Sequence, residues 1–300
     1  MTAFASLGSG SRGNATCVRM GDALLLVDCG FSLRQAEIRL ERLGVHAADI
    51  DAILVTHEHS DHASGVPALA ARYGIEVHAT HGTLRCFAPE LLAGMPVGTT
   101  VRGGHPFTLK GVEVMPVTVP HDAREPVQFV FRYGGCRIGV ISDLGCPTPH
   151  VLDHYRGCHG LFLESNHDRE MLMRGSYPPR LKRRIAGDLG HLSNGQAGEF
   201  LAAVAIPEMD VVIGHVSERN NHPDLLEETF GGWRGRVRSL GYATQREGAP
   251  WTVVGTGAGE SGESGEAGEA RGSAMPALQL AARDGRPRQG AGGVPAQPVE

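Results

Sequence analysis

The feature that most restricts the fold is an apolar run, AILV at residues 52–55, which is followed at once by Thr56 and the six residues HEHSDH. The run has the length and composition of a buried strand. A helix could not point all the polar groups that follow at one place, because neighbouring helical residues face apart. A loop that leaves a strand end can do so. We therefore expect a site that is built at the ends of strands.

Further polar residues follow apolar runs later in the chain: His121 follows VTV and Pro120, Asp143 follows IGVIS, and His215 follows VVI and a glycine. Each of these residues alone is typical of a structural or surface position. Together with the HEHSDH segment they form a set of imidazoles and carboxylates, which are ligands for zinc, manganese or iron. The set is larger than one ion needs and suits two ions about 3.5–4 Å apart. The candidate ligands are His57, His59, Asp61, His62, His121, Asp143 and His215.

Strand-like and helix-like patterns alternate over residues 1–254. Helical periodicity covers residues 32–43, 65–73 and 193–205, and the first of these segments begins at a serine cap and stops at Gly44. Turns rich in glycine and proline separate hairpin-like strands in the first part, and helices return later. This order predicts two sheets with helices outside, an α/β sandwich rather than one doubly wound sheet.

Composition limits the function classes. The net charge of −5 means that any nucleic-acid surface is a local patch, and 5% aromatic residues argue against a stacking platform for single strands. The cysteines include no CxxC pair, which argues against a zinc ribbon or a thioredoxin motif. Since neither a signal peptide nor an apolar stretch of about 18 residues is present, we expect a cytoplasmic protein with free thiols and no membrane partner.

The last part of the chain differs from the rest, because it is rich in glycine and has no aromatic residue. Such a segment cannot bury enough apolar surface to offset the entropy of ordering. We therefore expect one folded domain over residues 1–254 and a disordered low-complexity tail over residues 255–300, to which the sequence assigns no role.

Several motifs resemble one known family. HEHSDH fits the HxHxDH signature of metallo-β-lactamase-fold hydrolases, and Asp28 in LLLVDCG resembles the strand-end aspartate that supports the metal loop there. SLGSGSRGN, ESNHD, GHLSN and GHVSERNN resemble the YycJ/WalJ subgroup, which is related to RNase Z and to phosphodiesterases of this fold. The match covers nearly all of residues 1–254 and implies a four-layer αββα sandwich.

The resemblance also implies an activity: a binuclear metal-dependent phosphodiesterase on nucleic acid, a 5′-to-3′ exonuclease of DNA in preference to RNA. Its cofactors would be two divalent ions, Zn²⁺ or Mn²⁺, and a metal-bound hydroxide that Asp61 orients would attack the phosphodiester. Neither the native metal nor an oligomeric state follows from the sequence. By the resemblance, one ion would be bound by His57, His59 and His121, the other by Asp61, His62 and His215, and Asp143 would bridge them.

His191 is the candidate general acid. It lies in GDLGHLSNGQAGEF, just before a helix that Ser193 is placed to cap. By the resemblance it matches the histidine that RNase Z-type enzymes use to protonate the leaving group, and a histidine held close to that oxygen can serve as the acid. The alternative is a histidine at a helix entry that makes only a structural hydrogen bond.

Residues 165–190 are the most basic part of the chain, with six basic and three acidic residues. Their position between a site-bearing strand and His191 favours contact with a phosphate backbone, although most charge runs are only solvated helical faces. The GSGSRGN segment at residues 8–14 either turns its amides to a phosphate or forms a hairpin turn. The candidate substrate-binding residues are Asn166, His167, Arg180, Lys182, Arg183 and Arg184.

Two other functions are compatible with this sequence. One is a small-substrate hydrolase of the same fold that cleaves a cyclic phosphodiester, a thioester or a lactam. Against the last two substrates, His121 lies in VPHD and not in the Gly-His-Thr setting of glyoxalase-type members. The other is a metal-stabilised scaffold without catalysis, against which the large ligand set argues, because a structural zinc needs only four ligands.

Overall fold

The computed structural model describes residues 1–255. The tail predicted over residues 255–300 lies outside them except for Gly255, so the predicted domain boundary and the predicted disorder stay predictions. The described residues form two mixed sheets. In spatial order, the first sheet comprises β13 (Ala249–Val253), β1 (Thr2–Gly8), β2 (Ala15–Met20), β3 (Ala23–Val27), β4 (Ala52–Leu54) and β5 (Glu76–His78). The second comprises β12 (Ser239–Tyr242), β11 (Asp210–Gly214), β10 (Gly160–Glu164), β9 (Cys136–Ile141), β8 (Val127–Tyr133), β7 (Val112–Thr118) and β6 (Phe107–Leu109).

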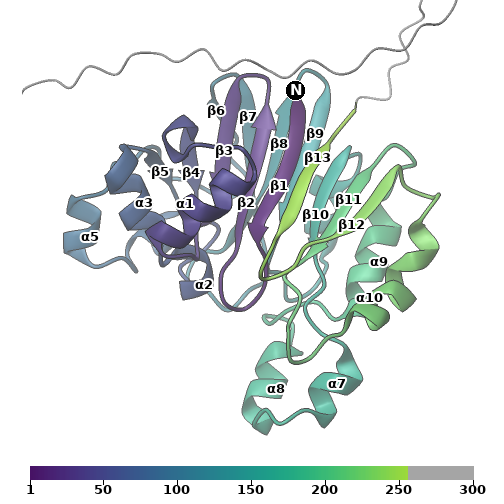
Figure 1. The fold of residues 1–300 in the computed structure, drawn as a ribbon. Helices are drawn as coiled ribbons and strands as arrows, with labels where there is room; N and C mark the ends of the chain where they lie inside the picture. The colour runs from purple at the N-terminus through teal and green to yellow at the C-terminus, as the bar shows by residue number, and fades with distance from the viewer. Residues whose placement is uncertain (256–300) are drawn as a thin grey trace, which may run out of the picture. The chain divides into compact units, whose positions relative to one another are not determined.

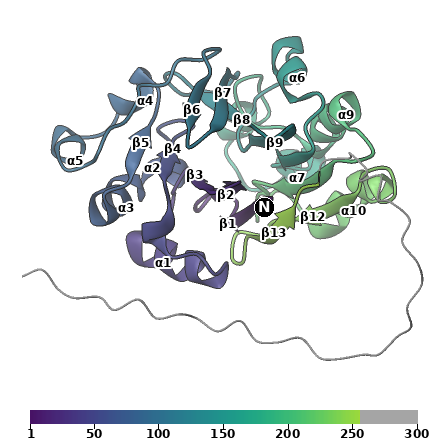
Figure 2. The same cartoon turned by 90° about the horizontal axis from the view of Figure 1, so that it is seen from above.

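The helices cover the outer faces of the sheets and the ends of their strands (Figures 1 and 2). Those that follow strands of the first sheet are α1 (Leu33–Arg42), the 3₁₀ turn η1 (Ala47–Asp49), α2 (Ser60–Ala63), α3 (Val66–Tyr73), α4 (His81–Leu84) and α5 (Pro89–Ala93). Those in the second half are α6 (Pro149–Tyr155), α7 (Arg169–Arg174), α8 (Pro179–Ile185), α9 (Asn194–Val204), α10 (Pro223–Phe230) and η2 (Gly231–Trp233).

Three apolar clusters define the layers. The central cluster lies between the sheets and contains Phe4 of β1 and Phe129 of β8. A second cluster packs Leu40 of α1 on the outer face of the first sheet, and a third packs Phe200 of α9 and Phe230 of α10 on the outer face of the second. Since each sheet is thus buried on both faces, the predicted four-layer αββα sandwich is confirmed.

The structure refines the predicted helices. Ser193 caps α9 with a full capping box, in which its hydroxyl accepts from Gln196 and the Gln196 side chain accepts from the Ser193 backbone. Ser32 is the N-cap residue of α1 as predicted, although its hydroxyl makes no capping hydrogen bond. The segment expected to be a loop after β4 is helical over one turn, because α2 begins at Ser60.

Topology brings the ends of distant strands to one edge of the sandwich. β9, β10 and β11 are mutually parallel, and β7 runs in the same direction because both it and β9 pair antiparallel with β8. In the first sheet β3 and β4 are parallel. The residues that follow two of these strands, Asp28 and His215, have positive φ angles of 61° and 48°. Such backbone is costly for residues other than glycine and is often found at functional sites.

Two further expectations concern the environment of the protein. Within residues 1–255, no helix combines the length and the hydropathy that a membrane crossing requires. The six cysteines all lie in this range, and all are free thiols as predicted. The cytoplasmic location stays a prediction.

Candidate metal centre

The seven candidate ligands come from four segments, and the structure brings them together at the common edge of the two sheets. His57 and His59 follow β4, and Asp61 and His62 lie on α2. The others follow strands of the second sheet: His121 comes after β7, Asp143 after β9 and His215 after β11.

One group of three imidazoles consists of His57, His59 and His121. One ligand atom from each lies within 4.8 Å of the others. The Nε2 atom of His121 is 3.3 Å from Nδ1 of His59, and the ring centres of His57 and His59 are 4.5 Å apart. Three ring nitrogens this close form a pocket that suits one cation.

A second group consists of Asp61, His62 and His215, and its ligand atoms also lie within 4.8 Å of one another. The Oδ2 atom of Asp61 is 3.4 Å from Nε2 of His62 and 3.7 Å from Nε2 of His215. This set of two imidazoles and a carboxylate is equally suited to a divalent ion.

Asp143 lies between the two groups. Its Oδ2 atom is 2.6 Å from Nε2 of His62 and 3.6 Å from Nε2 of His57, while its Oδ1 atom is 2.9 Å from Nδ1 of His215. The carboxylate is 1% exposed, and neither oxygen has a well-formed hydrogen bond to any residue in the described range. A buried carboxylate that is compensated only by neighbouring imidazoles is costly, so the position calls for a cation.

The histidine rings are fixed from behind, which leaves their other nitrogens directed at the site. Nδ1 of His62 is 2.8 Å from Oδ2 of Asp28, and the same carboxylate accepts hydrogen bonds from the backbone and the hydroxyl of Thr56. The Thr56 hydroxyl is also 2.9 Å from Nδ1 of His57. Partners of this kind orient metal-binding imidazoles and select their tautomer.

Backbone carbonyls fix two more rings. Nδ1 of His121 lies 3.0 Å from the carbonyl of Gly190, and Nδ1 of His215 lies 2.6 Å from the carbonyl of Ser142. Each contact places a proton on Nδ1, so in the neutral ring the lone pair is on Nε2. The His215 amide also donates to the hydroxyl of Ser9, which ties this ring to the first loop of the chain.

The charges in the site favour cation binding. Burial lowers the pKa of His57, and it lowers that of His121 to about 4, so both rings are neutral, the form that binds metals. Burial also acts to lower the pKa of His62 and His215, but the nearby carboxylates, Asp143 foremost, together outweigh it and raise the pKa of both rings. Burial acts to raise the pKa of Asp143, yet His215 and His62 hold it well below its usual range. The ionised carboxylate therefore demands positive charge, which one or two divalent ions can supply.

Glu164, at the end of β10, is a site residue that the sequence analysis did not identify. Its Oε1 atom is 2.6 Å from Nδ1 of His191, and its Oε2 atom accepts from the backbone amide of Leu144. The residue is fully buried. A charged residue that ends the all-apolar run GLFL was the signal available in the sequence.

Asn14 is the second such residue, and it belongs to the GSGSRGN segment. This segment joins β1 to its antiparallel neighbour β2, so its role as a hairpin connection is confirmed. It also supports the site, because the Asn14 amide lies 3.3 Å from Oδ2 of Asp61 and 3.1 Å from Nε2 of His62.

Asn166 and His167, expected as substrate contacts, are both buried. The Asn166 amide donates to the carbonyl of His215, so its side chain braces a candidate ligand. Nδ1 of His167 has no hydrogen-bond partner among residues 1–255. Their burial gives substrate no access to them in this structure and favours a supporting role.

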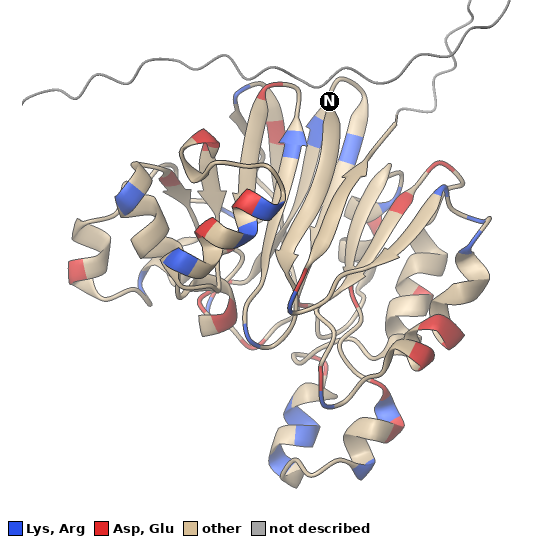
Figure 3. Ribbon diagram, in the orientation of Figure 1, with Lys and Arg blue, Asp and Glu red and all other residues tan. Residues whose placement is uncertain are grey.

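The four basic candidates all lie on α8 but differ in their surroundings. Arg184 pairs with Asp122 and lines the cavity in front of the histidines. Lys182 donates to the carbonyl of Met173 and so ties α8 to α7. Arg180 and Arg183 are exposed, and Figure 3 shows basic residues on both α7 and α8.

The cavity has a volume of about 390 Å³, and its lining includes His59, Asp61, Asp143, His191 and His215. A volume of this order is typical of small-molecule sites. The convergent polar groups and this cavity therefore form one site.

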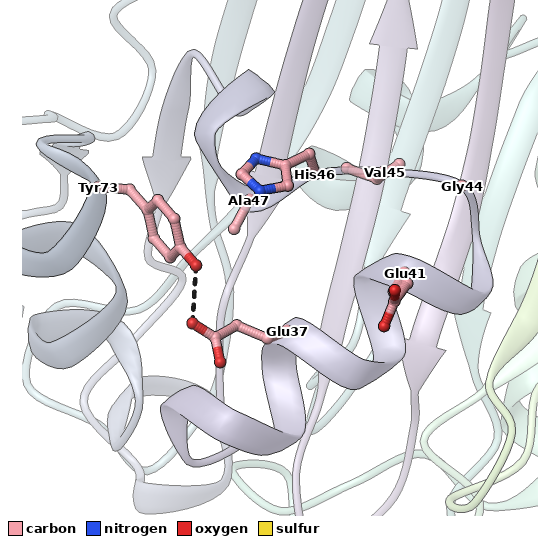
Figure 4. A pocket seen from close by; sticks show the side chains of 7 residues that line it. All are labelled: Glu37, Glu41, Gly44, Val45, His46, Ala47 and Tyr73. Carbon is pink, nitrogen blue, oxygen red and sulfur yellow. Dashed lines mark hydrogen bonds between the residues drawn. The ribbon is translucent and has the colours of Figure 1, made fainter. Parts of the chain in front are cut away.

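Another concavity, of about 360 Å³, lies between α1, the turn that follows it and Tyr73 of α3 (Figure 4). There the Tyr73 hydroxyl donates to Glu37 across 2.7 Å. None of the candidate ligands lines it, so it is not part of the metal centre.

The family model of the beta-lactamase superfamily domain matches residues 24–215. Exodeoxyribonuclease YycJ of Bacillus anthracis is 35% identical over 225 residues, which cover 74% of this chain and 85% of that protein. Exodeoxyribonuclease WalJ of Streptococcus pneumoniae is 32% identical over 231 residues, 76% of this chain and 86% of that protein. The solved structure of the metallo-beta-lactamase fold protein YhfI from Bacillus subtilis aligns with a TM-score of 0.63 over 82% of this chain and 98% of its own. Because the two sequences are only 14% identical, this similarity supports the fold and not the function.

Replacing Asp28 by asparagine tests whether the contact between this carboxylate and the His62 ring strengthens metal binding. The variant loses the carboxylate that accepts from both Thr56 and His62, so we expect affinity for zinc to fall about 10- to 100-fold. Competition with a chromogenic chelator measures the affinity. Asp22→Asn, an exposed acid in the turn before β3, is the matched control and should bind like the wild type. An unchanged affinity in Asp28→Asn would show that the ring of His62 needs no such support.

Proposed function

Because this chain belongs to the beta-lactamase superfamily, and within it to the family of the YycJ and WalJ exodeoxyribonucleases, we propose that it hydrolyses DNA from the 5′ end with two divalent metal ions. The chain is a metal-dependent hydrolase of the nuclease class, and the family predicted from its motifs is confirmed. The observation that carries the proposal is the arrangement of two ligand groups on either side of one buried carboxylate, Asp143.

The residues of the centre divide into two sets. His57, His59 and His121 would hold one ion, and Asp61, His62 and His215 would hold the other. Asp143 lies within reach of both sets, so it is the residue to bridge them. Zinc and manganese both suit these ligands, and when bound such ions make water more acidic and draw charge from phosphate oxygens.

Asp61 is the residue to orient the attacking water. Its carboxylate lines the cavity and is partly exposed, unlike that of Asp143. The amide of Asn14 approaches Oδ2 of Asp61 and fixes its direction. A carboxylate held in this way accepts a hydrogen bond from the water and keeps it in line with the phosphorus atom.

His191 is the residue to protonate the leaving oxygen. Its Nδ1 atom is bound to Glu164, and the ring lines the cavity with 22% of the side chain exposed, which leaves Nε2 to face the substrate. Burial acts to lower the pKa of His191, but Glu164 and Asp143 together outweigh it and raise the pKa well above its ordinary value. The imidazole is therefore protonated near neutral pH, as a general acid must be.

The basic face of α8 is the surface to bind the phosphate backbone. Arg184 lies in the wall of the cavity, and Arg180 and Arg183 are exposed on the same helix. Phosphate charges attract such clusters even on a protein of net negative charge. The placement next to the cavity supports this role over that of a solvated face.

Digestion of end-labelled oligonucleotides tests the proposal. With manganese or zinc supplied, we expect mononucleotides to be released from the 5′ end of DNA, and RNA to be cut more slowly. Asp143→Asn should lose at least 1,000-fold in rate, because the buried charge between the two ligand sets is removed. Hydrolysis of bis-p-nitrophenyl phosphate without any cleavage of DNA or RNA would contradict the proposal and favour a small-substrate phosphodiesterase.

The role of His191 predicts a dependence on the leaving group. His191→Ala should lower the rate on DNA about 100- to 10,000-fold, since the departing sugar oxygen needs a proton. On bis-p-nitrophenyl phosphate, whose nitrophenolate leaves without one, the loss should stay below about tenfold. His222→Ala is the matched control, because that histidine is exposed and only caps α10. Equal losses of His191→Ala on both substrates would exclude the acid role.

A further inference from the structure

The cavity in front of the metal centre has one apolar wall. Tyr177, Leu181 and Ile185 line it, together with the polar residues of the centre. All three come from α8 or the residues just before it. The apolar groups thus face the same space as the candidate ligands.

The apolar face of α8 is not used to build the core. None of the α8 residues, all of which lie in the described range, is buried. Leu181 and Ile185 are four residues apart and therefore lie on the same side of the helix. A surface helix normally buries such a side against the protein. Here that side is left available to whatever occupies the cavity.

The wall is firmly attached to the catalytic groups. The carbonyl of Ile185 accepts from the backbone amide of His191 at 2.9 Å, and Arg184 pairs with Asp122. A side chain at Gly190 would lie 2.2 Å from the carbonyls of Arg184 and Ile185, so the two backbones are in close contact. A group bound against α8 is therefore held at a fixed place relative to His191.

Tyr177 adds an aromatic ring beside positive charge. The guanidinium of Arg219 lies 5.9 Å from the centre of the Tyr177 ring, and Arg184 lies in the same cavity wall as the tyrosine. Nucleic acids present the matching combination, because each nucleotide joins a flat aromatic base to a phosphate. The low aromatic content of the chain excludes a long stacking platform, but one base requires only one ring.

We propose that Tyr177, Leu181 and Ile185 bind the unpaired nucleobase next to the scissile phosphate. This inference rests on the proposed nuclease function and deepens it by naming the part of the substrate that the wall recognises. A cavity of about 390 Å³ is at the small end of ligand sites, which suits one nucleotide and not a base pair. The enzyme therefore acts on a terminal nucleotide that has left its duplex.

A cycle that combines a variant with an abasic substrate tests the inference. Single-stranded oligonucleotides carry one abasic residue at the first, second or third position from the attacked end, and the full chain is assayed with manganese. For the wild type, an abasic residue at one of these positions should slow cleavage about tenfold or more relative to the unmodified oligonucleotide. Tyr177→Ala should slow the unmodified substrate by a similar factor, but should change the rate on that abasic substrate less than about twofold.

Controls separate this effect from general damage. Tyr133→Ala, at a tyrosine that is 40% exposed at the end of β8, should cleave all substrates like the wild type. Leu181→Ala is a second variant with the same expected pattern, should Tyr177→Ala fail to fold. Equal slowing of both substrates by Tyr177→Ala, or none, would overturn the inference. A wild type that cuts no oligonucleotide would instead refute the nuclease function.

Discussion

The burial of the Asp143 carboxylate among histidines is the interaction on which the site depends. An ionised carboxylate in a dry position is unfavourable unless positive charge compensates it. Here Asp143 is 1% exposed and lies within 3.6 Å of ring nitrogens from His57 and His62. Protons on the rings can supply part of the charge, but divalent ions supply more of it and satisfy the free nitrogens as well. The geometry of the centre thus follows from one electrostatic requirement.

The rest of the fold serves to hold that arrangement. Two sheets carry ligands from both sides to one edge, and the loops between strand and helix turn them inward. Asp28 and Glu164 act behind the candidate ligand His62 and the proposed acid His191, since each fixes one imidazole through Nδ1. Asp28 and His215 have backbone angles that cost free energy, and the surrounding hydrogen bonds are what maintain them.

Much of this could be predicted from the sequence, because the pattern of an apolar strand followed by a chelating residue is local. It placed His121, Asp143 and His215 at strand ends, and the sandwich followed from the order of the segments. The features that this local pattern did not predict depend on tertiary contacts. Glu164 ends an apolar run, and nothing local in the sequence shows that its side chain faces His191.

The same limitation explains the misplaced roles. Asn166 was expected to contact substrate, but it is buried, and its amide donates to the carbonyl of His215. Tyr177 and Leu181 looked like ordinary residues of a charged segment. Their significance appears only when α8 is seen to turn its apolar side toward the cavity.

Anomalous scattering from crystals grown with zinc or manganese is the most direct test of the central claim. Data collected on both sides of the absorption edge locate each ion without reference to activity. We predict two peaks about 3.5–4 Å apart, one on either side of the Asp143 carboxylate. A single peak, or peaks that do not touch Asp143, would contradict the account.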